Sequence, residues 1–292
     1  MTTPEANTSA TDALLRVENI TVRFDDLIAL EGISFQMGPG DTRVVLGAAG
    51  SGKTTLLKAC LGLIRPNSGR VYLFGRDITD LDERSLIDIR SEVGVLFQEG
   101  GLFDSMTVAD NVAYPLVNRR VHTIPASEID AKVEEALRFV ELSHTLEKFP
   151  AELSGGMRRR VGIARAVVSE PRLVLYDSPT AGLDPITANT IMALIAKERD
   201  SQNTASLIVT QRYQDGQLMA NFRYNRTHGQ LEPVSGNGAG NQNGSNPAHT
   251  IFMVMKEGRL IFEGVQAELE ASDDPYISKF VPKHSVTYGD SD

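Results

Sequence analysis

Short apolar runs, each bounded by turn residues, dominate the chain and predict a protein built around strands. β-Forming side chains cluster or alternate over residues 14–24 and 33–36, which indicates a pair of antiparallel strands. The pair 251–255 and 259–262 predicts a hairpin. The other expected strands are 43–46, 71–74, 91–97, 173–176 and 207–210.

Helical periodicity occupies the middle of the chain. From residue 105 to about 165 the apolar residues recur at helical spacing, and helices are also expected at about 53–63 and 186–200. The order strand, loop, helix, helical insert, strand, helix, strand implies a mostly parallel sheet with helices on its faces. The helical insert, residues 99–165, is expected to project as a subdomain.

Composition supports an ordinary α/β core and sets two polar segments apart. Hydrophobic residues make up 41% of the 292, and no apolar run reaches the roughly 18 residues that a membrane span needs. Residues 1–13 read as a disordered tail rather than an export signal. The insertion 214–250 is expected to be flexible, because its Gly- and Asn-rich part, 235–247, cannot bury a core.

Charge and cysteine content argue against a nucleic-acid-binding protein and against a disulfide-bonded one. A net charge of −9 with a pI of about 5.2 disfavours nucleic acid as the main partner, and Arg158-Arg159-Arg160 is the local exception. Cys60 is the only cysteine, so an internal disulfide cannot form, which suits a reducing cytosol. We expect Cys60 to serve in packing.

The most specific motif is a phosphate-binding loop at residues 47–55, Gly-Ala-Ala-Gly-Ser-Gly-Lys-Thr-Thr. It follows the apolar run 43–46 and opens a helix at Lys53, which is the context that the motif requires. The glycines let successive N–H groups point into one concavity, and the helix N-terminus adds its positive end. Lys53 would reach the β- and γ-phosphates, and the Thr54 hydroxyl would bind Mg²⁺. The predicted nucleotide-binding residues are Gly47, Ala48, Ala49, Gly50, Ser51, Gly52, Lys53, Thr54 and Thr55.

Two further motifs follow along the chain. The sequence Leu153-Ser154-Gly155-Gly156-Met157 starts a helix, with Ser154 as its natural N-cap and two glycines that let backbone N–H groups approach an anion. The apolar strand 173–176 ends at Asp177, which is the expected second partner of the magnesium ion.

In this order, the motifs resemble the nucleotide-binding subunit of an ATP-binding cassette (ABC) transporter over residues 14–264. The resemblance implies a P-loop NTPase (RecA-like) fold, with an antiparallel β subdomain beside the mostly parallel sheet and the helical insert. It implies that ATP and Mg²⁺ are bound, with Gln98 beside the metal and Phe24 stacked on adenine. The Ala181-Gly182-Leu183-Asp184 loop, which ends in Asp184, is implied to lie at a dimer interface.

Subunits of this family pair head to tail, with each ATP between the phosphate loop of one and the Ser-Gly-Gly helix start of the other. The residues that would face a partner's ATP are Leu153, Ser154, Gly155, Gly156 and Met157. The partner is a second copy or another ABC ATPase. The C-terminal tail, 265–292, could reach that partner or be loose, with Pro275-Tyr276 and Phe280-Val281 as anchor points.

The resemblance further implies a separate integral-membrane permease, and so a cytoplasmic protein held at the inner face of the cell membrane. Met157, where glutamine is usual, and the segment 102–116 look like the lipid-transporting Mla- and Mce-associated ATPases. In such proteins this segment borders the groove for the permease. The alternative is a non-transport cassette protein, a nucleotide-gated regulator that binds ATP but barely hydrolyses it.

The sequence departs from the family at two catalytic positions. Ser178 follows Asp177 where a glutamate polarises the attacking water, and Gln211 stands where a histidine contacts the γ-phosphate. Serine has no basic form near neutral pH, and glutamine cannot become a cation. We therefore expect binding of MgATP with slow hydrolysis at this site.

Three accounts of the double replacement stay open. The subunit pairs with an intact ATPase and lends it the Ser154 helix start, or both sites of a homodimer are slow and the protein is a regulator. In the third account another group substitutes for the missing base. The candidates for that group are Glu99, Asp184, His228 and His249.

Overall fold

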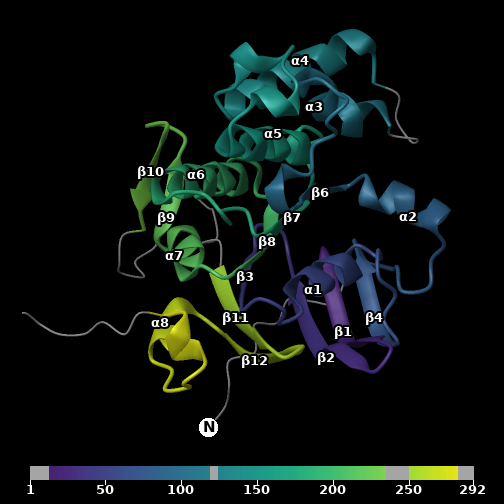
Figure 1. Ribbon diagram of the computed structural model, residues 1–292, viewed down its shortest axis with the longest axis vertical. Helices are drawn as coiled ribbons and strands as arrows, with labels where there is room; N and C mark the ends of the chain where they lie inside the picture. The colour runs from purple at the N-terminus through teal and green to yellow at the C-terminus, as the bar shows by residue number, and fades with distance from the viewer. Residues whose placement is uncertain (1–12, 119–123, 235–249, 282–292) are drawn as a thin grey trace, which may run out of the picture.

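The structure is a computed structural model that describes residues 13–118, 124–234 and 250–281. Its centre is a sheet of six strands in the order β12-β11-β3-β8-β7-β6 (Figure 1). Every neighbouring pair is parallel except β11 and β12, which form the expected hairpin. These strands are β3 (Thr42–Leu46), β6 (Val93–Leu96), β7 (Leu173–Asp177), β8 (Ala205–Thr210), β11 (Thr250–Lys256) and β12 (Arg259–Gly264). The expectation of a mostly parallel sheet is confirmed.

Side chains of the central strands alternate between the two faces, as the two-residue strand period requires. Val45 packs into the cluster beneath the second sheet, whereas Val44 and Leu46 pack with α7 (Tyr213–Asn221) and α8 (Gln266–Glu270). Tyr176, on β7, faces the cluster formed by the helical region. A sheet buried on both faces explains why its strands read as continuous apolar runs.

A second, antiparallel sheet packs beside the first in the order β2-β1-β4-β5. Its strands are β1 (Leu15–Phe24), β2 (Leu27–Met37), β4 (Ser68–Leu73) and β5 (Arg76–Asp77). Helix α1 (Lys53–Cys60) lies between the sheets and ends before the expected residue 63, because Gly62 turns the chain with a φ of 65°. Cys60 is buried in this cluster, and burial raises the pKa of its thiol to about 12, which supports a role in packing.

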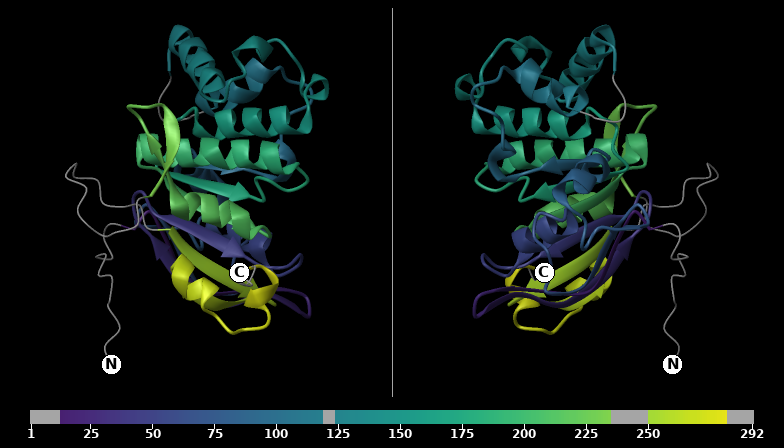
Figure 2. Two further views of the ribbon diagram at one scale, coloured as in Figure 1. Left: turned by 90° about the vertical axis from the view of Figure 1, so that its left-hand side faces the viewer. Right: turned by 90° about the vertical axis from the view of Figure 1, so that its right-hand side faces the viewer.

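Helices α3 (Val108–Val117), α4 (Ala126–Phe139), α5 (Gly155–Val167) and α6 (Pro185–Gln202) gather at one end of the molecule, away from the antiparallel sheet (Figure 2). They share one apolar cluster with β7 and β8, so the helical region is tied to the sheet rather than separate from it. The helical elements before β7 are α2 (Glu83–Arg90), η1 (Gln98–Gly100), α3 (Val108–Val117), α4 (Ala126–Phe139), η2 (Ser143–Thr145), η3 (Pro150–Glu152) and α5 (Gly155–Val167). After β7 follow α6 (Pro185–Gln202), α7 (Tyr213–Asn221), α8 (Gln266–Glu270) and η4 (Ile277–Lys279).

The insertion 214–250, expected to be flexible, contains regular secondary structure in its described part. Residues 213–221 form α7, and a hairpin follows, β9 (Phe222–Asn225) with β10 (Gln230–Pro233). Arg199, fully buried on α6, fastens the hairpin by donating to the carbonyls of Met219 at 2.6 Å and Phe222 at 3.0 Å. A charged side chain with satisfied hydrogen bonds orders a segment that composition alone marks as polar. Residues 235–249 lie outside the described part.

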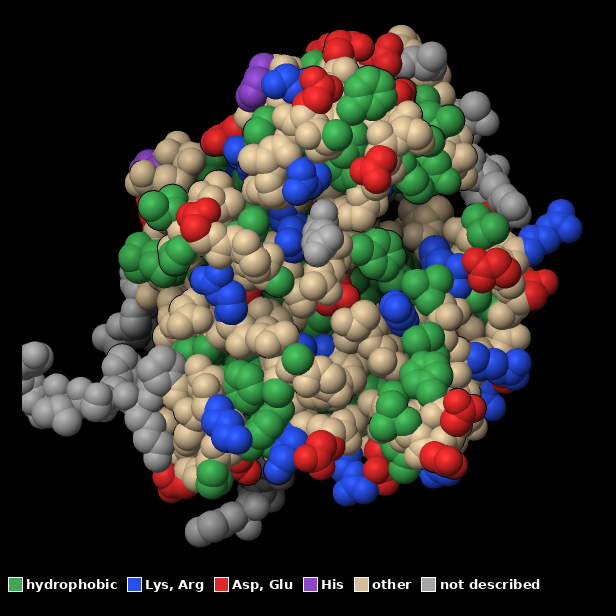
Figure 3. Space-filling view, viewed as in Figure 1, with side chains coloured by type: hydrophobic (Ala, Val, Ile, Leu, Met, Phe, Trp, Pro, Cys, Tyr) green, Lys and Arg blue, Asp and Glu red, His purple; other side chains and the backbone are tan. Residues whose placement is uncertain are grey.

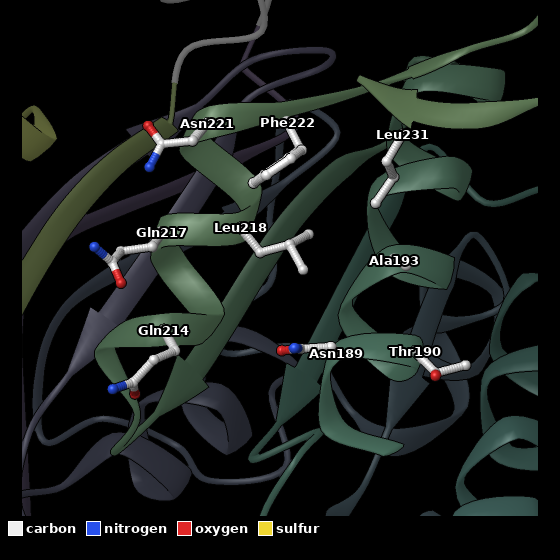
Figure 4. Close-up of a pocket in the computed structure, with 9 residues that line it drawn as sticks. All are labelled: Asn189, Thr190, Ala193, Gln214, Gln217, Leu218, Asn221, Phe222 and Leu231. Carbon is white, nitrogen blue, oxygen red and sulfur yellow. The ribbon is translucent and has the colours of Figure 1, made fainter. Parts of the chain in front are cut away.

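The hairpin, α6 and α7 enclose a groove of about 570 Å³ (Figure 4). Its lining is Asn189, Thr190, Ala193, Gln214, Gln217, Leu218, Asn221, Phe222 and Leu231. None of these belongs to the phosphate loop, so the groove is separate from the predicted nucleotide site.

The first part of the C-terminal tail packs on its own chain. Ile277 and Val281 are buried against Val44 and Leu46 of β3. The two anchor points named from the sequence therefore lie on or beside this core, and residues 282–292 lie outside the described part. Among the helices of the described residues, none has the length and apolar character to cross a membrane.

Candidate functional site

The phosphate loop connects β3 to α1 in the predicted strand–loop–helix arrangement. Gly50 and Gly52 have φ values of 75° and 103°, which L-side chains rarely adopt. A Cβ at Gly47 would lie 2.5 Å from the Met255 carbonyl oxygen, and one at Gly52 would lie 2.6 Å from the Ala29 carbonyl oxygen. Glycine is therefore required at these positions by backbone shape or by the closeness of neighbouring backbone.

Lys53 is folded onto the loop that it follows. Its Nζ donates to the carbonyls of Gly47 at 2.8 Å and Ala48 at 2.7 Å, and to the Ser51 hydroxyl at 3.2 Å. Burial lowers the pKa of Lys53 to about 8, and the negative charge of Asp177 opposes this shift. The ammonium group thus binds backbone carbonyl oxygens. Charged phosphate oxygens at the same place would accept stronger hydrogen bonds from it.

Two oxygen-bearing side chains that could hold a magnesium ion meet at the end of β7. The Thr54 hydroxyl donates to Asp177 Oδ2 at 3.0 Å, although the two residues are far apart in sequence. Asp177 is buried with 5% of its surface exposed. A hydroxyl and a carboxylate beside a phosphate site fit the donor set that Mg²⁺ prefers. The described residues contain no cluster of three His, Cys, Asp or Glu residues, so the rest of a magnesium shell would come from phosphate, water or amide oxygens.

Ser178 occupies a strained position next to this pair. Its φ is 49°, in the left-handed region, and its hydroxyl donates to Asp177 Oδ1 at 3.1 Å. The serine therefore donates to the second carboxylate oxygen of Asp177 and offers no base of its own. Gln211 is exposed at the end of β8.

Gln98 and Phe24, both predicted from the resemblance, are exposed. Gln98 begins η1, and Phe24 ends β1 with 46% of its surface accessible. In the described part of the chain, no hydrogen bond joins Gln98 or Gln211 to Thr54 or Asp177. The predicted roles of Gln98 beside the metal and of Phe24 on adenine stay predictions.

The signature sequence caps α5 as expected. The Ser154 hydroxyl accepts a hydrogen bond from the Met157 N–H at 3.2 Å, and Leu153 is buried. A Cβ at Gly156 would lie 2.7 Å from Thr187 Cγ2, so this helix start packs closely on the start of α6. Asp184 caps α6 by accepting from the Thr187 N–H at 3.0 Å, which lowers the pKa of its carboxyl group.

Arg159 is buried beside this site, although the sequence shows it only as one member of the basic run 158–160. Its guanidinium, 3% exposed, donates to the carbonyls of Ser178 at 2.7 Å and Ala181 at 3.1 Å. It therefore holds the loop after Asp177 against α5, the helix that follows the signature sequence. The middle arginine of the run lies on the inward side of the helix, and the apolar positions around it could have signalled this.

Asp215 was also missed. It is 2% exposed and accepts hydrogen bonds from the hydroxyls of Thr180 at 2.7 Å and Thr210 at 2.6 Å. It joins the loop after β7 to the end of β8, just before Gln211. Burial raises the pKa of its carboxyl group, and the two hydroxyls oppose that shift.

The structure describes the side chains of two of the four candidate substitutes for the missing base, His228 and Asp184. His228 lies in the β9–β10 turn, where its Nδ1 is 2.6 Å from Glu232 Oε1 and 3.2 Å from Asn225 Nδ2. Asp184 is occupied as a helix cap. His249 and the side chain of Glu99 lie outside the described part.

Comparisons with known proteins agree with this geometry. The family model described as ABC transporter matches residues 30–181, which hold the phosphate loop, the signature sequence and Asp177. The chain belongs to the ABC transporter family. Its ABC ATP-binding subunit character and its P-loop NTPase fold, both predicted from the sequence, are confirmed.

The curated relatives carry three different cargo descriptions. The chain is 35% identical over 72% of its length to the intermembrane phospholipid transport system ATP-binding protein MlaF of Haemophilus influenzae, and covers 79% of that protein. It is 39% identical to the methionine import ATP-binding protein MetN of Carboxydothermus hydrogenoformans over 62% of this chain. It is 40% identical to the probable ribonucleotide transport ATP-binding protein mkl of Mycobacterium leprae over 67% of this chain. The chain spans about half the length of the last two relatives, 53% and 56%.

Solved ABC cassettes share the fold. The dimeric post-hydrolysis structure of the ATP-binding cassette MJ0796 bound to ADP and Pi matches with a TM-score of 0.70 and 25% identity, over 86% of this chain and 98% of that one. The structure of cbiO1 from Clostridium perfringens, part of the ABC transporter complex cbiONQ, matches with a TM-score of 0.71 and 29% identity, over 89% and 92%.

Proposed function

We propose that this ABC subunit binds MgATP in a head-to-tail dimer and drives a separate membrane permease that carries phospholipid or another hydrophobic substrate. The observation that carries the proposal is the 3.0 Å contact between Thr54 and Asp177 beside the phosphate loop. These two oxygens would hold Mg²⁺, and Lys53 with the loop N–H groups would hold the phosphates. The metal would neutralise charge on the phosphate oxygens.

An apolar surface supports a permease partner. Phe97, Phe103, Tyr114 and Val117 are exposed, with accessible fractions of 41%, 40%, 38% and 62%. The rings of Phe103 and Tyr114 lie 4.7 Å apart, and hydrophobic side chains gather over α3 and α4 (Figure 3). Clustered exposed aromatic residues are typical of an interaction site.

This surface is also connected to the segment that carries Gln98, a residue predicted to belong to the nucleotide site. Arg165 of α5 donates to the carbonyls of Gly100 at 3.0 Å and Gly101 at 2.8 Å, two and three residues after Gln98. The same guanidinium lies 5.5 Å from the centre of the Phe103 ring. A permease helix seated on Phe103 would therefore press on the segment that carries Gln98.

The phospholipid assignment rests on two observations of unequal weight. The segment 102–116, which carries the exposed aromatic residues, looks like that of the Mla- and Mce-associated ATPases. The relative with the widest match among those described above, MlaF, is named for intermembrane phospholipid transport. Reconstitution with the permease that copurifies would test this assignment, since only lipid-dependent stimulation of ATP turnover agrees with it.

We further propose that hydrolysis at this subunit's own site is slow. Ser178 lacks the carboxylate that would act as general base, and Gln211 lacks the cationic form of histidine. Loss of a positioned base costs about 10²–10⁴ in rate. Nucleotide binding is retained, because the phosphates and Mg²⁺ are held by other groups.

The decisive experiment compares ATP turnover of the purified protein with that of the double variant Ser178→Glu/Gln211→His. We expect turnover of the double variant to rise by orders of magnitude, because it restores both missing groups. The same double variant in a Lys53→Ala background is the control and should stay inactive. Ordinary wild-type turnover of about 1–100 per second would refute slow hydrolysis.

The same replacements favour a second candidate function, a nucleotide-gated regulator without a permease. Copurification distinguishes the two. A multi-spanning membrane protein bound through the Phe103 and Tyr114 surface supports transport, whereas a ribosome or DNA partner supports the regulator. Phe103→Ser should release the membrane partner and leave MgATP binding unchanged.

A further inference from the structure

The C-terminal segment after α8 is attached to the strand that carries the phosphate loop. Ile277, 2% exposed, and Val281, 5% exposed, pack in one cluster with Val44 and Leu46 of β3. Asp274 orders the turn before them, because its Oδ1 accepts from the Tyr276 N–H at 2.6 Å and the Ile277 N–H at 3.3 Å. Tyr276 is therefore presented at a defined place next to the loop.

The Tyr276 hydroxyl makes two hydrogen bonds at the loop's first turn. It accepts from the Ala48 N–H at 3.1 Å and donates to the Met255 carbonyl at 3.2 Å. The Met255 carbonyl is one of two groups, with the Ser51 hydroxyl, that leave no room for a side chain at Gly47. One hydroxyl thus bridges the end of β11 and the first turn of the phosphate loop, with both its donor and its acceptor capacity used.

The ring that carries this hydroxyl is held from several sides. Phe280 meets it edge-on with ring centres 5.2 Å apart. The ammonium groups of Lys256 and Lys279 lie 5.4 Å and 5.8 Å from the ring centre, within the range of cation–π attraction. A ring fixed in this way loses little further entropy when its hydroxyl binds the loop.

The same short stretch of backbone is gripped on its other side by Lys53, which binds the Gly47 and Ala48 carbonyls. Lys53 must leave these carbonyls to reach a phosphate group, whereas Tyr276 binds an N–H and can stay. The tyrosine contact is then the side-chain contact that continues to hold this turn while the lysine changes partner.

We propose that Tyr276 is a positioning residue of the nucleotide site, whose hydroxyl keeps the Gly47-Ala48 turn in the shape that receives the phosphates. The inference rests on the proposed nucleotide binding and adds the C-terminal segment to that site. The segment would then favour binding through the loop rather than through the base of the nucleotide.

The test is Tyr276→Phe, which removes the hydroxyl and keeps the ring. One neutral hydrogen bond corresponds to about a two- to twelve-fold change in affinity. We expect calorimetry to show this loss for MgATP and, by the same factor, for magnesium tripolyphosphate, which has no base. Tyr72→Phe is the matched control, since the Tyr72 ring stacks under Arg16 on the other sheet and should leave both affinities unchanged.

Amide hydrogen exchange supplies a second readout that a general loss of stability would not reproduce. In Tyr276→Phe we expect faster exchange over residues 47–50 and unchanged exchange in β8. Unchanged affinities for both probes, or a loss confined to MgATP, would overturn the inference. If Lys53→Ala abolishes binding while Tyr276→Phe does not weaken it, only this inference fails. If Lys53→Ala still binds, the proposed function itself fails.

Discussion

Arg159→Met tests whether the signature helix holds the loop that follows Asp177. The arginine is 3% exposed and donates to the carbonyls of Ser178 and Ala181 at 2.7 Å and 3.1 Å. Methionine has similar length and no donor, so both carbonyls would lose a charged partner while the packing volume is largely kept.

The magnitude follows from these two contacts. A hydrogen bond from a charged donor contributes about 1.5–3 kcal/mol, so two of them correspond to about 3–6 kcal/mol. Removal of a buried cation recovers part of this through its desolvation cost. We expect a net loss of about 2–4 kcal/mol in the free energy of unfolding.

Urea unfolding of the nucleotide-free protein measures this loss, and Arg160→Met is the matched control on the same helix. Arg160 is half-buried and donates to Val140 O at 3.3 Å, with Glu141 at 3.9 Å, so its replacement should cost under about 1 kcal/mol. We also expect Arg159→Met to weaken dimerisation driven by MgATP, since the Ser178–Asp184 loop would shift. Equal losses of unfolding free energy in Arg159→Met and Arg160→Met would show that Arg159 does not hold this loop in place.

Three further predictions concern titration and packing. Lys53 has a pKa of about 8 when it faces carbonyls, and phosphate would raise it, so the complex takes up a proton. MgATP affinity should then be full at about pH 7 and fall as the pH rises through 8, by up to about tenfold per unit, and a flat calorimetric profile to about pH 9 would contradict this. Burial raises the pKa of Glu198 from 4.5 to about 7, so the folded state holds the extra proton and stability falls as pH rises through that window. Glu198→Gln should stabilise the protein by about 3 kcal/mol at pH 8 and by almost nothing at about pH 4.5, and equal urea midpoints at pH 8 would contradict it. Gly216→Ala places a Cβ 2.3 Å from Phe252 Cε1 and should lower the free energy of unfolding, measured in urea, by about 1–3 kcal/mol. A stabilised variant would contradict this, because it would show that the helix moves to make room for the methyl group.

The sequence predicts best where local pattern and chemistry coincide. The phosphate loop lies between β3 and α1 as expected, because its glycines and the apolar run before it act within a few residues. The meeting of Thr54 with Asp177 was also foreseen, because parallel strands bring their carboxyl ends to one edge of a sheet. Alternation along β1 and β2 was enough to predict their antiparallel pairing.

Long-range contacts explain what the sequence did not predict. Arg159 reads as one member of a basic run until the fold places Ser178 and Ala181 above it. The β9–β10 hairpin depends on Arg199 of α6, and the C-terminal segment depends on a surface of β3 and β11 that forms only in the folded protein. In each case the partner is distant in sequence, so no local pattern identifies it, although the apolar positions around Arg159 indicate that this residue faces inward.

Binding of MgATP is the central claim, and calorimetry of the purified protein with and without magnesium tests it most directly. We predict magnesium-dependent uptake of one ATP per chain, which Lys53→Ala abolishes without lowering the urea midpoint of the nucleotide-free protein. Absence of uptake by the wild-type protein, or equal uptake by Lys53→Ala, would contradict the account.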